Sequence, residues 1–439
     1  MNLLFQLLFA IFLVVGIGFF IKNVKKLTRN IKLGKPVQWS DNPNQRLKNM
    51  LRIAFGQSKM TNRPVPALLH LVVYVGFIII NLEMLEIILD GLFGTHRIFA
   101  FLGGFYNILI GSFEVLAALV LVAVIVFWFR RNVLKVKRLS HPDLDAYPKK
   151  DANTILYFEM VLMSLFLLMN AADLQLQTLG IHHYTAVGSF PISQFIAPVF
   201  NGMSETVIVI IERAAWWLHI IGILLFLNYL YYSKHLHILL AFPNTYFAEL
   251  KPKGQFKNLE SVTNEVKLML DPTADPFAAP ATDAVPEKFG ASDVFDLTQL
   301  QLLNAYTCTE CGRCTSVCPA NITGKKLSPR KIMMATRDRL EEVGKNIDKN
   351  NGTFVDDGKT LLNNYITPEE LWACTTCNAC VEECPISISP LSIIMDMRNY
   401  LVMEQSAAPT ELNAMMTNIE NNAAPWQYNQ MDRLNWAKE

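Results

Sequence analysis

The chain has 439 residues, a hydrophobic content of 51% and a formal charge of +1 at neutral pH. This composition is too apolar for an ordinary soluble protein of this length, so part of the chain is expected to lie in a lipid membrane. The balanced charge argues against nucleic-acid binding, which needs a basic face across a domain. Long apolar runs fill the region from Leu3 to Tyr232, and all eight cysteines follow it. Two different kinds of domain are therefore joined in one chain.

Five segments are apolar over the roughly 20 residues that a transmembrane helix needs. They are Leu3 to Ile21, Val65 to Leu89, Tyr106 to Phe129, Thr154 to Ala172 and Glu205 to Tyr232. The first segment has no basic residue before it and no cleavage site of small residues after it. We therefore expect it to be retained as a helix rather than removed as a signal peptide.

The basic residues between these segments predict the orientation in the membrane. Residues 22–63 contain eleven Lys and Arg and residues 130–150 contain seven, whereas the loop around Arg97 has one and residues 173–204 have none. Because basic loops stay on the cytoplasmic side, the amino terminus is expected outside. Everything after Lys234 is then expected in the cytoplasm, attached to the cytoplasmic (inner) membrane.

The cysteines form two copies of one motif. The copies consist of Cys308, Cys311, Cys314 and Cys318 before Pro319, and of Cys374, Cys377, Cys380 and Cys384 before Pro385. The spacing C-x2-C-x2-C-x3-C-P is typical of two-cluster ferredoxins, in which the fourth cysteine of each motif ligates the cluster of the other motif. The predicted ligand sets are Cys308, Cys311, Cys314 and Cys384 for one 4Fe-4S cluster, and Cys374, Cys377, Cys380 and Cys318 for a second.

Structural zinc is the simpler alternative for a cytoplasmic domain with eight cysteines, because disulfides are rare in that compartment. Zinc ligands usually come as two C-x2-C pairs and not as a run of four that ends in proline, so the spacing favours clusters. About 55 residues separate the motifs, and they include Ser328 to Val343 and Pro368 to Trp372, which have helical periodicity. These features predict an α-helical ferredoxin domain.

Two histidines at the predicted cytoplasmic end of the apolar segments are candidate haem ligands. His70 lies near the start of the second segment and His237 follows the fifth, so both belong to the same leaflet. Imidazoles from facing helices can ligate a haem iron axially, and a b-type haem is indicated because no C-x-x-C-H attachment motif is present. The plainer alternative is that both are interfacial residues that bond to backbone or lipid headgroups.

Helix geometry orders the remaining histidines. In a continuous helix His219 and His237 are five turns apart on one face, whereas His235 points about 160° away from His219. His219 and His235 are therefore secondary candidates for haem ligation. His219 is equally a candidate to contact a quinone or the haem propionates, or to bond within the bundle. His96 is expected to be an exposed loop residue.

Acidic residues are costly inside a membrane and often mark a function there. Glu83, Glu86, Glu114 and Glu212, with Arg213 beside it, lie in the outer halves of the predicted spans. Among them, Glu83, Glu86, Glu212 and Arg213 are candidates for a quinone pocket or a proton path. The alternative is that several simply lie close to the membrane interface.

The predicted organisation is an all-α chain with four parts. Residues 271–287 are rich in Pro, Ala and Asp without an apolar period, which indicates a linker. The parts are residues 1–240 as a five-helix transmembrane bundle for haem b and quinone, residues 241–290 as a linker, residues 291–405 as the helical ferredoxin domain with two 4Fe-4S clusters, and residues 406–439 as a docking tail.

The last apolar segment carries a family resemblance. Trp216-Trp217-Leu218-His219 followed by Ser233-Lys234-His235-Leu236-His237 resembles the last helix of the gamma subunit of respiratory nitrate reductase and related haem b quinone oxidoreductases. In that family the two histidines of this helix bind two different haems. The resemblance implies that His219, His237 and His70 are haem ligands. The remaining family ligand would fall at Ile80, so the pattern supports one haem and leaves the second without a partner.

The cysteine-rich half carries a second resemblance. Phe289-Gly290-Ala291 and Cys308-Thr309-Glu310-Cys311-Gly312-Arg313-Cys314 are similar to the heterodisulfide-reductase-related membrane iron-sulfur oxidoreductases. Some of these pass electrons from electron-transfer flavoprotein to menaquinone. Such proteins usually continue into cysteine-rich CCG domains, whereas this sequence stops at Glu439. The resemblance implies that a CCG-domain subunit is a partner and that the tail from about Thr410, with Trp426 and Trp436, docks on it.

The sequence therefore predicts an electron-transfer subunit of a membrane quinone oxidoreductase, with lipid, quinone and a cytoplasmic partner, and catalytic only with that partner. No G-x-G-x-x-G or P-loop motif indicates a flavin or nucleotide site. The chief alternative is a haem-free, membrane-anchored iron-sulfur sensor or scaffold, which would keep the cysteines without needing paired histidines. A transporter is a further alternative, disfavoured because no repeated or broken helices are evident.

Overall fold

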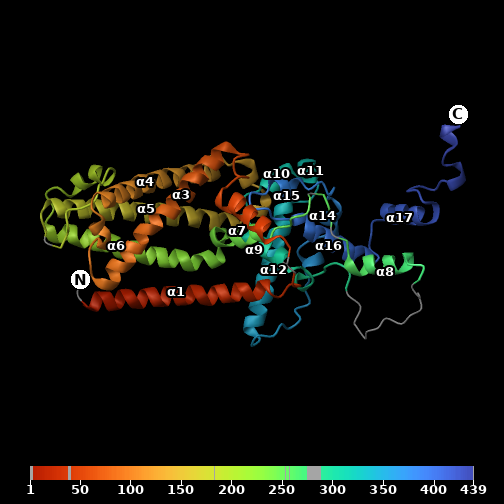
Figure 1. Cartoon of the computed structure of the whole chain (residues 1–439), viewed down its shortest axis with the longest axis horizontal. Coiled ribbons are helices and arrows are strands. Elements are labelled where there is room, and N and C mark those ends of the chain that lie inside the picture. The colour runs from red at the N-terminus through yellow and green to blue at the C-terminus, as the bar shows by residue number, and fades with distance from the viewer. Residues whose placement is uncertain are drawn as a thin grey trace.

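The computed structural model of the chain describes residues 3–37, 41–181, 183–252, 254–256, 258–273 and 288–438. Within these ranges every element is helical, and five long apolar helices are joined to a carboxyl-terminal domain that contains the cysteines. The predicted all-α fold class is confirmed. The bundle and the cysteine-rich domain lie end to end along the long axis of the molecule (Figure 1). Residues 274–287, which are most of the stretch rich in Pro, Ala and Asp, lie outside the described residues.

The bundle contains one helix for each predicted span. Its helices are α1 (Leu3–Ile31), α3 (Pro64–Phe93), α4 (Gly104–Asn132), α5 (Tyr147–Thr178) and α6 (Glu205–Tyr229), and a short turn extends α6 to Tyr232. All five are long and apolar enough to cross a membrane. A helix is suited to that environment because its backbone groups bond within the segment.

The helices of the bundle pack in chain order. α3 packs on α4, α4 on α5 and α5 on α6, while α1 lies against α3 and α6. Ile110, Phe166 and Ile220 are fully buried between them. In contrast, only 6% of the most apolar stretch of α1 is buried, so this helix presents apolar side chains to the surroundings on most of its surface. Such a surface suits lipid and not water.

The cysteine-rich domain is built from short helices around two longer ones. They are α9 (Gln299–Thr307), α10 (Arg313–Val317), α11 (Pro319–Ile322), α12 (Pro329–Lys349), α13 (Leu361–Asn364), α14 (Pro368–Trp372), α15 (Ala379–Glu383) and α16 (Pro390–Met403). The two stretches with helical periodicity form α12 and α14. The Ser328 and Thr367 side chains cap these helices by accepting backbone N–H bonds. α10 packs against α15, so the two cysteine motifs lie side by side.

The basic segments of the bundle contact the cysteine-rich domain. Lys26 and Arg29, near the end of α1, pair with Asp348 of α12. Arg63, directly before α3, pairs with Glu383 of α15 at 2.7 Å. The loop after α4 also donates hydrogen bonds to this domain. The end of the bundle that carries the basic loops therefore faces the cysteine motifs.

Four further α-helices lie outside these two units or between them. α2 (Pro43–Met50) leads into α3 through a π-helical turn. α7 (His237–Tyr246) and α8 (Glu260–Leu270) lie wholly or partly in the interval predicted as a linker, so that interval contains helical structure. In the tail, α17 (Thr410–Asn422) has no buried residue, and the Trp426 and Trp436 side chains are 61% and 77% exposed. Docking of the tail stays a prediction.

A buried arginine holds α12 to the loops around it. Arg339 is fully buried, and its guanidinium pairs with Asp293 at 2.8 Å and Asp357 at 2.6 Å. It also donates to the Lys359 carbonyl at 2.7 Å. Because a buried charge is tolerated only when it is paired and bonded, these contacts act as a unit.

The change Arg339→Met leaves both carboxylates without their cation. We expect the free energy of unfolding to fall by about 3–5 kcal/mol, because an uncompensated buried charge is strongly destabilising. Thermal unfolding of the detergent-purified chain measures this as a lower midpoint. The matched control Lys326→Met removes an exposed pair with Glu369 (side chains 69% and 63% exposed) and should cost less than about 1 kcal/mol. Equal midpoints for both variants would contradict the assignment.

Candidate functional site

Cysteines from both motifs line one pocket in the cysteine-rich domain. The lining includes Cys308, Cys311, Cys314, Cys380 and Cys384. Cys384, the last cysteine of the second motif, lies within electrostatic range of both Cys311 and Cys314. The structure therefore brings together the four cysteines predicted for the first cluster, here called the inner cysteine group (Cys308, Cys311, Cys314 and Cys384).

The other four cysteines form a second group, and one of them, Cys380, also lines the first pocket. Cys318, Cys374 and Cys377 all lie within electrostatic range of Cys380. Cys377 is exposed, the only cysteine of the eight that is, whereas Cys318 is buried. The structure therefore also brings together the second predicted set, here called the outer cysteine group (Cys318, Cys374, Cys377 and Cys380), and one of its members reaches the protein surface.

The two motifs fold with the same backbone turns. Glu310 and Thr376, each two residues after the first cysteine of its motif, have φ of 55° and 57°. Gly312 and Asn378, each directly after the second cysteine, have φ of 71° and 60°. These left-handed residues curl the loop so that an amide can reach a sulfur, and the Thr376 N–H donates to Cys374 Sγ at 3.4 Å. Such bonds stabilise thiolate ligands.

The sulfur environment suits iron ligation. Burial raises the pKa of the Cys308 and Cys380 thiols to about 12 and that of Cys384 to about 11, so the thiolates need cationic charge beside them. Within the described ranges, no three His, Cys, Asp or Glu donors converge closely enough to hold one metal ion. The four thiolates of a 4Fe-4S cluster each bind a different iron, so they need not meet at one point as the ligands of a single metal ion do. The inner cysteine group surrounds a pocket.

Gly312 allows the loop after α4 to approach the first cysteine motif. A Cβ on Gly312 would lie 2.6 Å from Arg330 Nη1 and 2.8 Å from the Arg138 carbonyl oxygen, and its φ of 71° also favours glycine. The Arg138 guanidinium donates to the Cys311 carbonyl, and Arg330 donates to the Arg138 carbonyl at 2.8 Å. The membrane bundle thus touches the inner cysteine group directly.

Three histidines gather at the same end of the bundle. The His70 and His237 ring centroids are 6.4 Å apart with 43° between the ring planes, and His235 lies 5.5 Å from His237 at 89°. His237 Nδ1 bonds to the Lys234 carbonyl at 3.1 Å, which leaves Nε2 for another partner. Burial lowers the pKa of His237 and lowers that of His235 to about 3, so both imidazoles are neutral and can act as ligands.

The position of His235 differs from the sequence-based expectation. That expectation assumed one helix from His219 to His237, but α6 ends at Tyr229, and two short 3-10 turns precede α7, which begins at His237. Ser233 is extended, with φ of −112° and ψ of 147°. The break resets the helical phase, so His235 and His237 both reach the histidine group.

His219 lies apart from the other histidines. It is 2% exposed, Nδ1 bonds to the Leu162 carbonyl at 3.0 Å, and its ring centroid is 6.0 Å from that of Phe166. These contacts come from α5 and not from a second histidine. A buried histidine that forms a hydrogen bond within the bundle accounts for these contacts.

The histidine and cysteine segments pack directly on each other. α7, which begins at His237, packs on α9, which ends next to Cys308. Asn244 of α7 donates to the Ile386 carbonyl at 2.7 Å and accepts a bond from Asn304 at 2.9 Å. The candidate haem ligands and the inner cysteine group therefore lie on segments that pack on each other.

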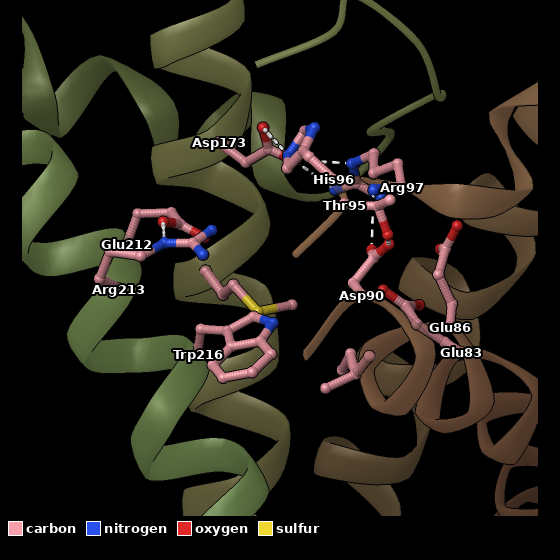
Figure 2. Close-up of a pocket in the computed structure, with 12 residues that line it drawn as sticks. Glu83, Glu86, Asp90, Thr95, His96, Arg97, Asp173, Glu212, Arg213 and Trp216 are labelled. Atoms are coloured by element: carbon pink, nitrogen blue, oxygen red, sulfur yellow. Dashed lines mark hydrogen bonds and ion pairs between the residues drawn. The ribbon is translucent and has the colours of Figure 1, made fainter. Parts of the chain in front are cut away.

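The opposite end of the bundle contains a polar pocket, here called the far-end pocket (Figure 2). It is lined by Glu83, Glu86, Ile87, Asp90, Thr95, His96, Arg97, Met169, Asp173, Glu212, Arg213 and Trp216. Figure 2 shows Glu83, Glu86 and Asp90 on α3 facing Glu212 and Arg213 on α6. The structure thus brings together all four residues predicted for a quinone pocket or proton path.

Arg97 is the centre of this network. Its guanidinium donates to Asp173 at 2.7 Å, to Asn170 at 3.1 Å and to the Tyr106 hydroxyl at 3.2 Å. His96 was expected to be exposed, but this expectation is wrong: its side chain is 10% exposed, and Nε2 lies 3.3 Å from Asp173. Sequence reasoning missed Arg97 and Asp173 because each seemed to be a single charge in a loop.

Comparison with known proteins agrees with the cysteine geometry. Residues 307–388 match the family of 4Fe-4S dicluster domains. Together with the eight cysteines, this match assigns two 4Fe-4S clusters to the domain. No solved structure gives a significant match to the chain.

Curated relatives are similar over nearly the whole chain. "Probable iron-sulfur-binding oxidoreductase FadF" of Bacillus subtilis strain 168 is 29% identical, over 99% of this chain and 61% of that protein. "EtfAB:quinone oxidoreductase" of Syntrophomonas wolfei subsp. wolfei is 25% identical, over 100% of this chain and 60% of that protein. The chain therefore spans about three-fifths of the length of these relatives.

A shorter match supports the same relationship. "Probable membrane-anchored ferredoxin" of Chromohalobacter salexigens is 34% identical over 36% of this chain and 25% of that protein. Further short matches, at 27% and 28% identity, are subunits of CoB–CoM heterodisulfide reductases. The chain is thus related to membrane-anchored iron-sulfur oxidoreductases and to heterodisulfide reductase subunits.

Glu310, inside the first cysteine motif, forms a buried ionic contact with the bundle segment. Its side chain is 2% exposed and pairs with Lys234 and, at 2.6 Å, with Arg337. Burial opposes ionisation of this carboxyl, but Lys234 and Arg337 outweigh it and hold the Glu310 pKa below its usual value. The ionised carboxylate therefore contributes stability above the ordinary pKa of glutamate, and that stability is lost as the pH falls through the lowered value.

We expect Glu310→Gln to lower the thermal unfolding midpoint at neutral pH, because Lys234 and Arg337 lose their anion. We also expect the variant to lose part of the wild-type decline in midpoint below about pH 4.3, the ordinary glutamate value. Midpoints measured from pH 7 down to pH 3 test this. The control Glu369→Gln changes an exposed carboxylate and should keep the wild-type curve. A Glu310→Gln curve parallel to wild type would contradict the assignment.

Proposed function

We propose that the chain is an electron-transfer component of a membrane quinone oxidoreductase. In this function electrons are relayed between a cytoplasmic donor or partner subunit, two 4Fe-4S clusters, haem b and a membrane quinone such as menaquinone. The observation that carries the proposal is the direct packing of the histidine segment on the inner cysteine group, through α7 and α9. Two redox sites held this close suit transfer of electrons and not bond chemistry.

The cysteines of the two groups hold the clusters in the crossed arrangement. The inner cysteine group takes its fourth ligand, Cys384, from the second motif, and the outer cysteine group takes Cys318 from the first. Support comes from the electrostatic proximity of Cys384 to Cys311 and of Cys318 to Cys374. When bound, the clusters accept and donate single electrons. The protein supplies thiolates, N–H bonds to sulfur and a largely buried setting.

His70 and His237 hold one haem b. Their ring centroids are 6.4 Å apart, and the Lys234 carbonyl fixes the His237 ring, so the two imidazoles would hold the haem iron and let it exchange single electrons. His235 lies beside them as a secondary candidate. His219 has no neighbouring histidine to share a second haem, although a quinone or propionate contact stays compatible with its position.

The positions of the sites suggest their order. Cys377 is exposed and so offers the outer cysteine group to a soluble partner, whereas the inner cysteine group faces the bundle. The contact between the basic segments and the cysteine-rich domain supports a cytoplasmic location for that domain, since basic loops stay on that side. Glu83, Glu86, Glu212 and Arg213 then lie toward the outer side, as candidates for quinone or proton handling.

The names of the relatives guide the choice of partners. One relative is an EtfAB:quinone oxidoreductase, and others are heterodisulfide reductase subunits. We therefore propose electron-transfer flavoprotein as a donor, quinone as the membrane partner and a CCG-domain iron-sulfur polypeptide as a neighbour. The domains are proposed to run as residues 1–240, 241–290, 291–405 and 406–439.

A haem-free membrane-anchored ferredoxin, acting as a sensor or scaffold, is the second candidate. The match to a membrane-anchored ferredoxin favours it specifically. The sensor or scaffold function requires the cysteines and the apolar helices. It does not explain why two imidazoles face each other. The two candidates differ in whether haem is present.

Cysteine variants test the crossed ligand sets. We expect Cys384→Ser to perturb the same paramagnetic cluster signal as Cys308→Ser, and Cys318→Ser to perturb the same signal as Cys374→Ser, because ligands of one cluster act together. Electron paramagnetic resonance of the reduced, purified variants, with iron and sulfide content, measures this. If Cys384→Ser instead matched Cys374→Ser, each motif would hold its own cluster and the crossed sets would be wrong.

Histidine variants test the haem. A reduced-minus-oxidised optical spectrum of the purified chain should show a b-type haem signal that is lost in both His70→Ala and His237→Ala, because each variant removes one of the two imidazoles proposed to hold the haem. His141→Ala, at a partly exposed loop position, is the control and should keep the signal. Clusters without any haem signal in wild type would leave the anchored ferredoxin as the better function.

A further inference from the structure

The acidic side chains of the far-end pocket are not equivalent. Glu86 accepts bonds from the Tyr106 hydroxyl at 2.8 Å and the Phe99 N–H at 3.0 Å. Glu212 pairs with Arg213 and accepts a bond from the Tyr184 hydroxyl at 2.9 Å. Both carboxyl groups therefore have hydrogen-bond donors beside them.

The remaining carboxylates of the region are satisfied in the same way. Asp90 accepts bonds from Thr95 and the Arg97 N–H. Asp173 pairs with Arg97 and His96. Glu114 of α4 accepts bonds from Asn170 and two backbone N–H groups.

Glu83 is the exception. It is 3% exposed, lines the pocket, and its Oε2 has no hydrogen-bond partner among the described residues. It lies ten residues before the end of α3, about 15 Å along the helix, well inside the bundle. An unpaired oxygen on a buried carboxyl group is the unusual feature of this pocket.

The charges around Glu83 cannot neutralise it. Arg213 lines the same pocket but is paired with Glu212. The charged groups that act most strongly on Glu83 are Arg97, Glu86, Glu114 and Asp173. The single cation among them is already paired with Asp173 at 2.7 Å. An isolated buried carboxylate takes up a proton instead of remaining charged, because burial of an uncompensated charge is too costly.

A metal cation fits this pocket less well than a proton. Hard cations such as calcium take six or more oxygen ligands. In the far-end pocket most carboxylate oxygens already accept hydrogen bonds, and two guanidinium groups, Arg97 and Arg213, would repel a second cation. One unpaired carboxyl oxygen provides a single proton-binding position.

The pocket also provides a partner for that proton. Its cavity volume is about 30 Å³, which is enough for a water molecule. His96 lines the same cavity, and its Nδ1 has no partner among the described residues while Nε2 faces Asp173. An imidazole with one nitrogen held by a carboxylate and the other free is suited to pass protons.

We propose that Glu83 is a buried proton-binding site, which holds a proton in the folded chain and exchanges it through cavity water and His96 with the aqueous phase at the far end of the bundle. The proton leaves the Glu83 carboxyl for water, and the reverse transfer restores it. The site does not rest on the proposed electron-transfer function, and its test involves no redox reaction.

Infrared spectroscopy of the purified full chain in detergent tests the site. At neutral pH wild type should show the C=O band of a protonated carboxyl group, and the band should shift to lower frequency in D2O. We expect Glu83→Gln to lose this band. The control Glu205→Gln, at an exposed position in the first turn of α6, should keep it.

Four results would overturn the proposal. A wild-type chain without the band, or a band that persists in Glu83→Gln, would show that Glu83 is ionised or that another group is protonated. A band that vanishes when sodium replaces a large organic cation would show a metal site. A band that does not shift in D2O would show a trapped proton. If Glu83→Gln does not fold, Glu83→Asp serves in its place and should move the band.

The route through His96 has its own variant. We expect His96→Phe to slow the D2O shift of the Glu83 band while the band itself persists, because the proton is still bound but its exit is blocked. An unchanged exchange rate would contradict this route.

Discussion

The buried Lys234 ammonium group joins the two halves of the molecule. It lies in the turn after the last long helix, is 8% exposed, and pairs with Glu310 inside the first cysteine motif. It also donates to the Pro148 carbonyl at 2.8 Å. Since a buried charge is costly unless it is fully paired, the cysteine motif and the bundle cannot separate without exposing or orphaning these groups. The relative position of the histidines and the inner cysteine group depends on this contact.

The rest of the junction follows from the same constraint. Asp151 of α5 bonds the Lys234 N–H at 3.1 Å and the Tyr229 hydroxyl at 2.7 Å, so the end of α6 is held where the helix breaks. The break turns His235 and His237 toward His70. Arg138 and Gly312 then bring the loop after α4 against the inner cysteine group. Electrostatic contacts at the junction thus determine which histidines and cysteines face each other.

Sequence patterns predicted the elements whose chemistry is local. The five spans follow from hydropathy alone, and the cysteine spacing indicates crossed clusters because the fourth cysteine of each motif is set apart from the other three. Distant pairings could not be predicted in this way. Arg97 and Asp173 are 76 residues apart in sequence, so neither the pair nor the burial of His96 beside it has a local signal. The predicted direction of the His235 side chain was wrong because the helix breaks at Ser233. The extended backbone of Ser233 is not indicated by any periodicity in the sequence.

In the proposed relay, electrons pass between the cysteine-rich domain and the bundle, so a reductant that supplies the clusters should also reduce the haem. Rapid mixing of the purified chain with a soluble low-potential reductant, followed through the optical bands of the haem, measures this transfer most directly. The account predicts that haem reduction slows sharply when Cys384→Ser disables the inner cysteine group, at unchanged haem content. Haem reduction at the wild-type rate in that variant would contradict the account, because the clusters would then lie outside the path.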